Sequence, residues 1–363
     1  MRKLVRIIFI TINVLIVIAL LASSIAGWIP PSKCIWISYL SYGFLLLVAV
    51  NIAASLLWLF FKRWEFLISL IAILLRFNMI PLFIQVGGTE RVVESEQRSA
   101  SDELKVMTYN LHGFNGKNNE EKKNKKNAAL FLEIVKEECP DVICAQEMNT
   151  LIDYSVSDSL KNIGYRYQYS VRMDNKGHPF GATVISRSPI NYVQSIDKSG
   201  RKIYADITKD KFKVRVVCVH MSSYSFGSAE RDVLQGIKNN DIDTSHTHQL
   251  FTKVKDNLLK HEAEWNDDLA PIINESPYPI VLAGDFNDTP ASHLYYKVSR
   301  KLKDAFVEQG KGFSVTYNGS FPAYRIDYIF HSDTLNALAY KCLDGKFSDH
   351  NGVMATFELK RKS

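Results

Sequence analysis

Carboxylates are almost absent from the first 89 residues of the chain, where Glu65 is the only one. The same region contains three long apolar stretches, at residues 4–29, 35–61 and 66–86. Each approaches or exceeds the ~20 residues that a helix needs to cross a bilayer. The scarcity of charge and the length of these stretches predict a transmembrane anchor of about three helices over residues 1–86.

Basic residues are unevenly distributed around these stretches. Several precede the first one, and Lys62 and Arg63 separate the second from the third, whereas only Lys33 separates the first from the second. Because positively charged loops stay on the cytoplasmic side, the N-terminus is predicted to be cytoplasmic. Three spans then place the rest of the chain outside the cytoplasm, in a multi-pass protein of the cell (inner) membrane. Arg76 interrupts the third stretch, and without that span the domain would instead be cytoplasmic.

Cysteine motifs are also lacking. The chain has 5 cysteines, with no CxxC pair and no spacing that resembles a zinc site. Cys144 and Cys218 lie inside apolar runs, where free cysteines are commonly buried. The sequence therefore predicts buried free thiols.

An excess of basic charge is missing from the rest of the chain. There are 44 Lys and Arg against 38 Asp and Glu, but 9 of the basic and only 4 of the acidic residues lie in the first 100 positions. The remainder is therefore close to neutral, which does not favour a tight nucleic-acid binder. The polar, glycine-led residues 87–102 are typical of a linker. Residues 103–363 have the mixed composition of a globular domain large enough to bury a substantial core.

Short apolar runs alternate with amphipathic stretches in this domain. Strands outnumber helices, and several strands follow one another as hairpins, which favours an α/β sandwich of two mixed sheets covered by helices. No internal repeat is present. The predicted strands are residues 104–109, 141–145, 183–186, 203–207, 212–220, 280–283, 325–330 and 354–359, and the predicted helices are 128–138 and 251–273.

Polar side chains recur where these apolar strands begin or end. Burying such groups without partners costs several kcal/mol, so their repetition is more informative than any one of them. Taken alone, Asn110 would be a turn residue and His220 a core histidine, whereas together they predict one polar rim. The residues are Asn110, Glu147, His220, Asp285, Asn287, Asp327, Asp349 and His350.

The residue types at this rim fit metal-assisted phosphoester hydrolysis. A hard cation such as Mg²⁺, with Mn²⁺ as the alternative, prefers oxygen ligands, which Glu147 with Asn110 supplies and to which Asp349 adds a further contact. A carboxylate must orient or deprotonate the attacking water, and Asp285 fits that role. Asn287 is a neutral donor for the phosphate oxygens.

The histidines complete this hypothesis. His220 and His350 are predicted to hold phosphate oxygens through the transition state. Asp327 is predicted to keep His350 protonated and fixed, as a histidine–aspartate pair does. His112, His178 and Arg187 are weaker candidates for the substrate groove.

Seven motifs carry a resemblance to a known family. Their order and spacing resemble those of the endonuclease/exonuclease/phosphatase superfamily, the group of DNase I, abasic-site endonucleases, neutral sphingomyelinases and inositol-polyphosphate phosphatases. The resemblance implies a four-layer αββα sandwich, here preceded by transmembrane helices as in a membrane-anchored bacterial member. It also implies the roles given above for each matched residue. The motifs are TYNLHG (108–113), QE (146–147), GATVISRSPI (181–190), VCVHMSS (217–223), GDFND (284–288), RIDYIF (325–330) and SDHNG (348–352).

Three functions stay open at this point. The first is a metal-dependent phosphodiesterase or nuclease. The second is a phosphatase or phospholipase C-like enzyme that acts on a lipid or sugar head group at the membrane surface. The third is a catalytically silent membrane scaffold, which would have lost some of the matched residues. The predicted partners are a phosphoester substrate (nucleic acid, phospholipid or phosphorylated small molecule) and the membrane, and no protein partner is predicted.

Overall fold

The computed structural model describes most of the chain. Nearly all of the predicted linker and the candidate His178 lie outside the described residues. Described are residues 3–87, 102–114, 121–149, 153–170, 180–224, 236, 247–318 and 324–359.

Two six-stranded sheets form the centre of the domain. The first has the strand order β11-β12-β1-β2-β4-β3 and the second has the order β5-β6-β7-β8-β10-β9. The strands of the first sheet are β1 Glu103–Asn110, β2 Val142–Asn149, β3 Tyr167–Ser170, β4 Phe180–Ser186, β11 Asn336–Leu343 and β12 Gly352–Glu358. Those of the second are β5 Ile190–Ser195, β6 Lys202–Lys209, β7 Phe212–His220, β8 Ile280–Asp285, β9 Lys303–Asp304 and β10 Asp327–His331.

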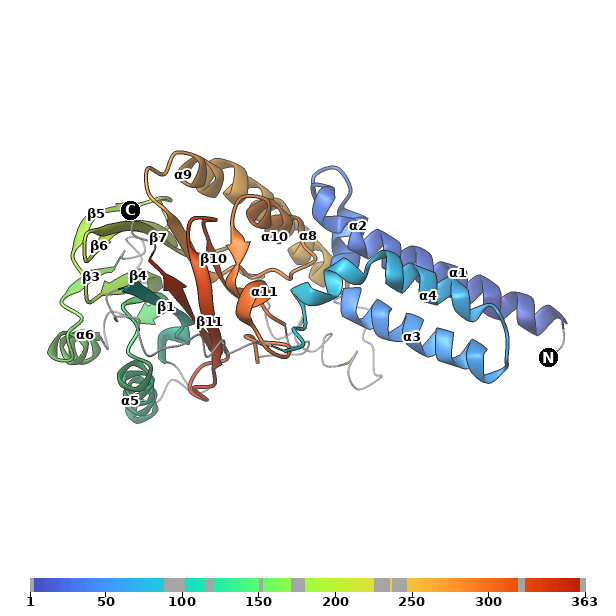
Figure 1. Ribbon diagram of the computed structural model, residues 1–363, viewed down its shortest axis with the longest axis horizontal. Helices are drawn as coiled ribbons and strands as arrows, with labels where there is room; N and C mark the ends of the chain where they lie inside the picture. The colour runs from blue at the N-terminus through green and yellow to red at the C-terminus, as the bar shows by residue number, and fades with distance from the viewer. Residues whose placement is uncertain are drawn as a thin grey trace.

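Helices cover both outer faces of the sheet pair (Figure 1). Phe131 of α5 packs in one outer core with Tyr109 of β1, and Trp265 packs in the other with Phe330 of β10. The inner faces of the two sheets share a third apolar core, so the predicted four-layer αββα sandwich is confirmed. The helical elements are α5 Glu121–Glu138, α6 Asp153–Asn162, α8 Thr247–Glu264, the π-helix η5 Trp265–Leu269, α9 Ala270–Asn274, α10 His293–Ser299 and α11 Ala305–Gln309.

Strand direction gathers the polar strand ends at one rim. β1 and β2 run parallel, and so do β7 and β8, so their carboxyl ends point the same way. β10 runs antiparallel to β8 and places Asp327 directly opposite Asp285. The rim is therefore a consequence of topology, as the sequence predicted.

The N-terminal helices extend away from the sandwich, with the N-terminus at the far tip (Figure 1). The segment Lys3–Trp28 is 26 residues long, apolar and long enough to cross a membrane, and only 11% of its apolar 18-residue stretch is buried. Such exposure of apolar side chains does not suit the core helix of a soluble domain. The elements are α1 Lys3–Ser24, η1 Ala26–Trp28, α2 Ile35–Ser41, α3 Phe44–Phe60, α4 Phe66–Leu75 and η2 Phe77–Leu82.

The prediction of one continuous helix over residues 35–61 is wrong. The segment is two helices, α2 and α3, bent by 70° at Tyr42 and Gly43. Glycine is a poor helix former. The Tyr42 carbonyl accepts a hydrogen bond of 3.1 Å from the Tyr324 hydroxyl, so contacts with the domain support the break.

The third apolar stretch is also less regular than predicted. Only 10 of its residues form the α-helix α4, which spans ~15 Å, and the 3₁₀ segment η2 with Pro81 follows. Membrane crossing by the second and third stretches, and the side on which the domain lies, therefore stay predictions. Polar contacts such as the 2.6 Å hydrogen bond from Ser69 to Asn13 join the helices of the bundle, as is common between helices in lipid.

Candidate active site

Backbone irregularities aim three side chains at the rim. The register between β2 and β4 shifts between Ala145 and Met148, and Glu147 within this bulge has a φ of 50°. Asn287 also has a φ of 50°, and His112 one of 45°. Bulges and positive φ angles at residues other than glycine tend to gather at functional sites, so this clustering marks the rim as a candidate site.

Gly284 lets β8 reach the rim in close contact with β7. A Cβ atom at this position would lie 1.9 Å from the Val219 carbonyl oxygen, and the φ angle is 156°. Only glycine fits here without displacing backbone. The glycine of the GDFND motif therefore positions the following aspartate, Asp285.

Asp285 is the central carboxylate of the site. It is 1% exposed, and its Oδ2 accepts hydrogen bonds from Asn110 Nδ2 at 3.0 Å and Asn287 Nδ2 at 3.3 Å. Its Oδ1 accepts from the Asn287 backbone N–H at 2.8 Å. Burial and the neighbouring Asp327 carboxylate raise the pKa of Asp285. A carboxylate that is easier to protonate than usual is suited to accept a proton.

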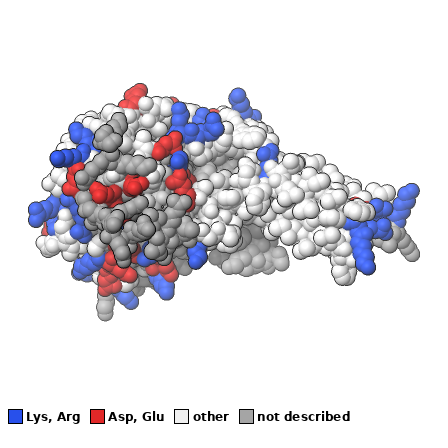
Figure 2. All heavy atoms as spheres, in the orientation of Figure 1, with Lys and Arg blue, Asp and Glu red and all other residues white. Residues whose placement is uncertain are grey.

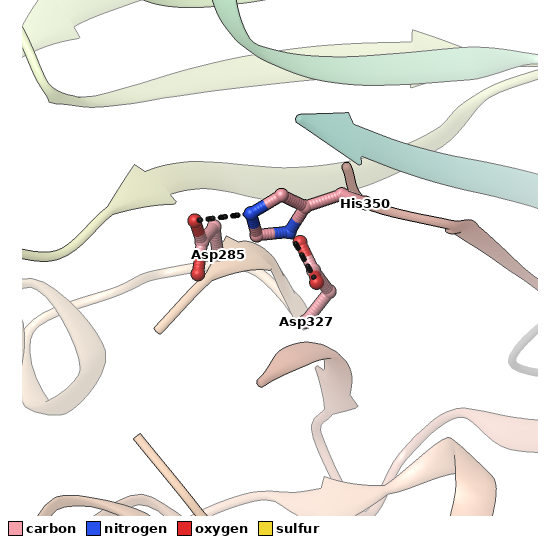
Figure 3. Close-up of side chains that lie close together, drawn as sticks. All are labelled: Asp285, Asp327 and His350. Atoms are coloured by element: carbon pink, nitrogen blue, oxygen red, sulfur yellow. Dashed lines mark hydrogen bonds and ion pairs between the residues drawn. The ribbon is translucent and has the colours of Figure 1, made fainter. Parts of the chain in front are cut away.

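His350 lies between two carboxylates (Figure 3). Its Nδ1 is 2.9 Å from Asp327 Oδ2, and its Nε2 faces Asp285 Oδ2 at 3.8 Å. Burial alone would lower the pKa of His350, but Asp327 and Asp285 outweigh it and raise the pKa to about 10. One atom of each of these three residues could bind a metal ion, and these three atoms lie within 4.8 Å of one another. The hydrogen bond and the favoured positive charge on the ring fit a histidine–aspartate pair better than a metal site.

His220 faces the same carboxylate from β7. Its Nε2 lies 3.7 Å from Asp285 Oδ2 and 3.7 Å from Glu147 Oε1. This nitrogen is buried and makes no hydrogen bond within the part of the chain that the structure describes. Because buried polar atoms are normally paired, His220 Nε2 is suited to bind an oxygen atom of a ligand.

A cluster of carboxylate and amide side chains lies beside Asp285, His350 and His220. Glu147 Oε2 and Asp349 Oδ1 are each 3.6 Å from His112 Nδ1, and Asn110 Nδ2 is 3.4 Å from Glu147 Oε1. Burial would raise the pKa of Glu147, but His112 and His220 hold it at about 2, so it is charged. Asp349 Oδ1 is buried and has no hydrogen bond in the described part of the chain. Two carboxylates, one of them with a buried oxygen that accepts no hydrogen bond in the described part of the chain, fit the donor set of a hard divalent cation.

All eight residues predicted from strand ends lie at or beside this rim, and His112, only a weak candidate from sequence, lies between the two carboxylates. Arg187 is not part of the site. It stacks 4.4 Å over the Tyr165 ring, and its N–H donates to the carbonyl of Asp141 at the opposite end of β2. The candidacy of Arg187 for the groove is therefore wrong.

A second buried histidine–carboxylate pair supports the loop after β8. His261 of α8 has its Nδ1 3.2 Å from Asp288 Oδ2 and its Nε2 2.7 Å from the Ser222 carbonyl oxygen. Both of these partners are hydrogen-bond acceptors, which favours the doubly protonated, positively charged ring, although Asn257 Nδ2 also lies 3.2 Å from Nε2. Burial lowers the pKa of His261, but the Asp288 carboxylate outweighs burial and raises it.

This pair predicts a pH-dependent stability. The stabilisation from His261 should be complete below its unfolded pKa of about 6.5 and lost as pH rises through the higher folded pKa. Chemical unfolding of the full chain and of His261→Gln in the same detergent would measure it. We expect the difference in free energy of unfolding between them to shrink as the pH rises above roughly 6.5, the unfolded pKa of histidine, into the alkaline range. A difference that is constant over this range would mean that His261 is neutral.

Comparison with known proteins agrees with the geometry. A family model described as "Endonuclease/Exonuclease/phosphatase family" matches residues 107–350. The chain belongs to this family. A second model, of a domain of unknown function, matches residues 5–83, which are the N-terminal helices. No curated protein matches the chain.

The chain is also similar to solved structures. The endonuclease/exonuclease/phosphatase from Bacteroides vulgatus is 16% identical with a TM-score of 0.50, over 71% of this chain and 99% of that one. A family protein from Leptotrichia buccalis C-1013-b is 17% identical with a TM-score of 0.49, over 70% and 99% of the two chains. The human Nocturnin catalytic domain is 18% identical with a TM-score of 0.48, over 71% and 95%. At 16% identity, the similarity to the Bacteroides vulgatus structure shows the fold alone.

Proposed function

We propose that the chain is a divalent-metal-dependent phosphoester hydrolase of the phosphodiesterase type, attached to a membrane by its N-terminal helices. Membership of the endonuclease/exonuclease/phosphatase family supports phosphoester hydrolysis as the class of reaction. One observation carries the assignment of residues: His220 Nε2 and His350 Nε2 lie 3.7 and 3.8 Å from the same Asp285 oxygen. A base with two ring nitrogens beside it is suited to in-line attack of water on a phosphoryl group whose developing charge these nitrogens stabilise.

The protein side chains divide the work as follows. Asp285 orients the attacking water and accepts its proton on a carboxylate oxygen. His350, kept protonated by Asp327, donates its Nε2–H to a phosphoryl oxygen as negative charge develops there. His220 Nε2 and the Asn287 amide bind the remaining oxygens. Asp327 contacts no substrate in this scheme and acts as a positioning residue.

The metal would be held by Glu147, Asp349 and Asn110. When bound, it neutralises and polarises the phosphoryl group. We propose Mg²⁺, with Mn²⁺ as the alternative, because both prefer oxygen ligands. His112, which lies 3.6 Å from both carboxylates, would position them.

Removing the metal or His350 tests this proposal. The purified full chain should hydrolyse bis-p-nitrophenyl phosphate with Mg²⁺ and lose that activity with a chelator. His350→Gln should lower kcat by about 10²- to 10³-fold, because the charged donor is gone. His331→Gln is the matched control: His331 is also buried and lies 3.1 Å from a carboxylate, Glu308, but at the other end of β10. Equal loss in both variants would remove His350 from the mechanism.

A further inference from the structure

The N-terminal helices dock onto the end of the sandwich that holds the candidate active site. The Tyr42 hydroxyl, at the bend between α2 and α3, donates to Asp288 Oδ1 at 3.1 Å. Asp288 directly follows Asn287, and Tyr324, which contacts the Tyr42 carbonyl, lies three residues before Asp327. The bend therefore contacts two of the segments that carry the proposed catalytic residues.

Further contacts hold the helices in one position on the domain. The Gly27 carbonyl oxygen lies 2.7 Å from His293 Nδ1, and a Cβ atom on Gly27 would lie 2.9 Å from the Tyr296 Cβ. Arg325 Nη2 donates to the Leu82 carbonyl at 2.6 Å. Because these contacts come from η1, the α2–α3 bend and η2, the helices are joined to the domain at several points and not through a single linker.

The lipid-facing surface begins close to this junction. Leu46, near the start of α3 and four residues after Tyr42, is 68% exposed, and Trp28 and Trp36 near the domain are 57% and 72% exposed. Exposed tryptophans of this kind mark the interface between membrane and water. The apolar part of the bundle therefore starts within about one helical turn, ~5 Å, of the residue that contacts the Asp288 loop.

In a bilayer that begins at this junction, the candidate site would lie at the depth of the lipid head groups. Asp285 precedes Asp288 by three residues, which span at most ~10 Å of extended chain. The head-group layer on each side of a bilayer is roughly 5–8 Å thick, the difference between a ~30 Å core and a total of ~40–45 Å. A site this close to the apolar helices can reach a phosphate of the leaflet without a change in the fold.

The charge of the domain does not suit a long polyanion. On the face shown in Figure 2, Lys and Arg are scattered among Asp and Glu and do not form a continuous stripe. Nucleic-acid binding at useful affinity depends on several Lys or Arg contacts to phosphates. A single phosphoester presented by the membrane needs only the groups at the rim.

We propose that the substrate is a phosphoester carried by a lipid in the bilayer that holds the helices. This rests on the proposed phosphoester hydrolysis. Water attacks the phosphorus, its oxygen forms the new P–O bond, and its proton passes to Asp285. The P–O bond to the diacylglycerol oxygen breaks, and this leaving oxygen takes up a proton from water, to which Asp285 returns the proton that it accepted.

Reconstituted vesicles test whether the lipid must share the bilayer with the protein. The full chain is placed in vesicles of phosphatidylethanolamine and phosphatidylglycerol, and release of head-group phosphate into the water phase is measured. In parallel, the same labelled lipids are supplied only in separate vesicles without protein. We expect hydrolysis in the shared bilayer to be about 100-fold faster than across vesicles, because tethering raises the effective concentration.

Soluble substrates separate the two levels of the proposal. Deacylated forms of the same lipids, plasmid DNA and bis-p-nitrophenyl phosphate are assayed with the same vesicles. Three results would contradict the lipid substrate if bis-p-nitrophenyl phosphate is still hydrolysed: no hydrolysis of lipid, equal rates of lipid hydrolysis in shared and separate vesicles, or faster hydrolysis of DNA or of the deacylated forms than of lipid. Each of them would leave the proposed phosphoester hydrolysis intact. No Mg²⁺-dependent turnover of any of these compounds would overturn both.

Discussion

Asp285→Asn should lower kcat by about 10³-fold while the folded protein becomes no less stable, or more stable, than the wild type. The substitution keeps the shape of the side chain but removes the base. Asp285 is 1% exposed and is paired across the sheet with Asp327, which is fully buried. Since burial and Asp327 both raise the pKa of Asp285, the charged form costs stability near neutral pH, and the amide removes that cost. Turnover of bis-p-nitrophenyl phosphate and thermal unfolding in the same detergent would measure both effects.

Asp206→Asn is the matched control with the opposite expectation. Asp206 is also buried, but its two oxygens accept hydrogen bonds from Arg215 at 2.7 and 2.8 Å. Its charge therefore has a partner, and removing it leaves a buried guanidinium unpaired. We expect Asp206→Asn to lower the melting temperature and keep kcat. If Asp285→Asn retained activity, the base would have to be another group.

Gain of stability on loss of activity is a known property of active sites, where unfavourable contacts are kept for function. In this protein the unfavourable contact is specific: two buried carboxylates, Asp285 and Asp327, on neighbouring strands. His350 lies between them and bonds to Asp327 at 2.9 Å. The positive charge of the His350 imidazolium reduces the repulsion between the two carboxylates. The same imidazolium is the proposed hydrogen-bond donor to the phosphoryl group.

The rim could be predicted from sequence because its residues lie where apolar strands begin or end. The apolar run IVLAG predicts a buried strand, and Asp285 after it marks the end of that strand. Because burying a polar group without partners costs free energy, each polar residue at a strand end indicates a functional role. The order of the motifs then related the separate strands to one fold. Local sequence was sufficient because each catalytic candidate depends mainly on its own strand.

Other features depend on contacts between distant residues and could not be predicted. The break at Tyr42 involves Asp288 and Tyr324, which lie more than 240 residues away along the chain. The bulge at Glu147 appears only in the pairing of β2 with β4. Apolar periodicity reports burial, and it contains no information about which partner a bend or a bulge will meet.

Glu147→Gln should weaken binding of Mn²⁺ by on the order of 100-fold, as measured by titration calorimetry on the full chain. The amide keeps an oxygen but loses the charge that His112 and His220 stabilise, and these two histidines hold the pKa of Glu147 at about 2 against the effect of burial. Because weakened binding can be overcome by mass action, activity lost at low Mg²⁺ should return in part as Mg²⁺ is raised.

Glu308→Gln is the control for this experiment. Glu308 has a side-chain exposure of 29%, against 28% for Glu147, and it also lies near a histidine, His331, at 3.1 Å. It lies away from the rim, so we expect its substitution to leave Mn²⁺ affinity unchanged. If Glu147→Gln bound Mn²⁺ as tightly as the wild type, Glu147 would not be a ligand of the metal. In that case the cluster of Asp285, Asp327 and His350 would be the remaining buried group able to hold an ion among the described residues, and the histidine–aspartate pair would lose its proposed role.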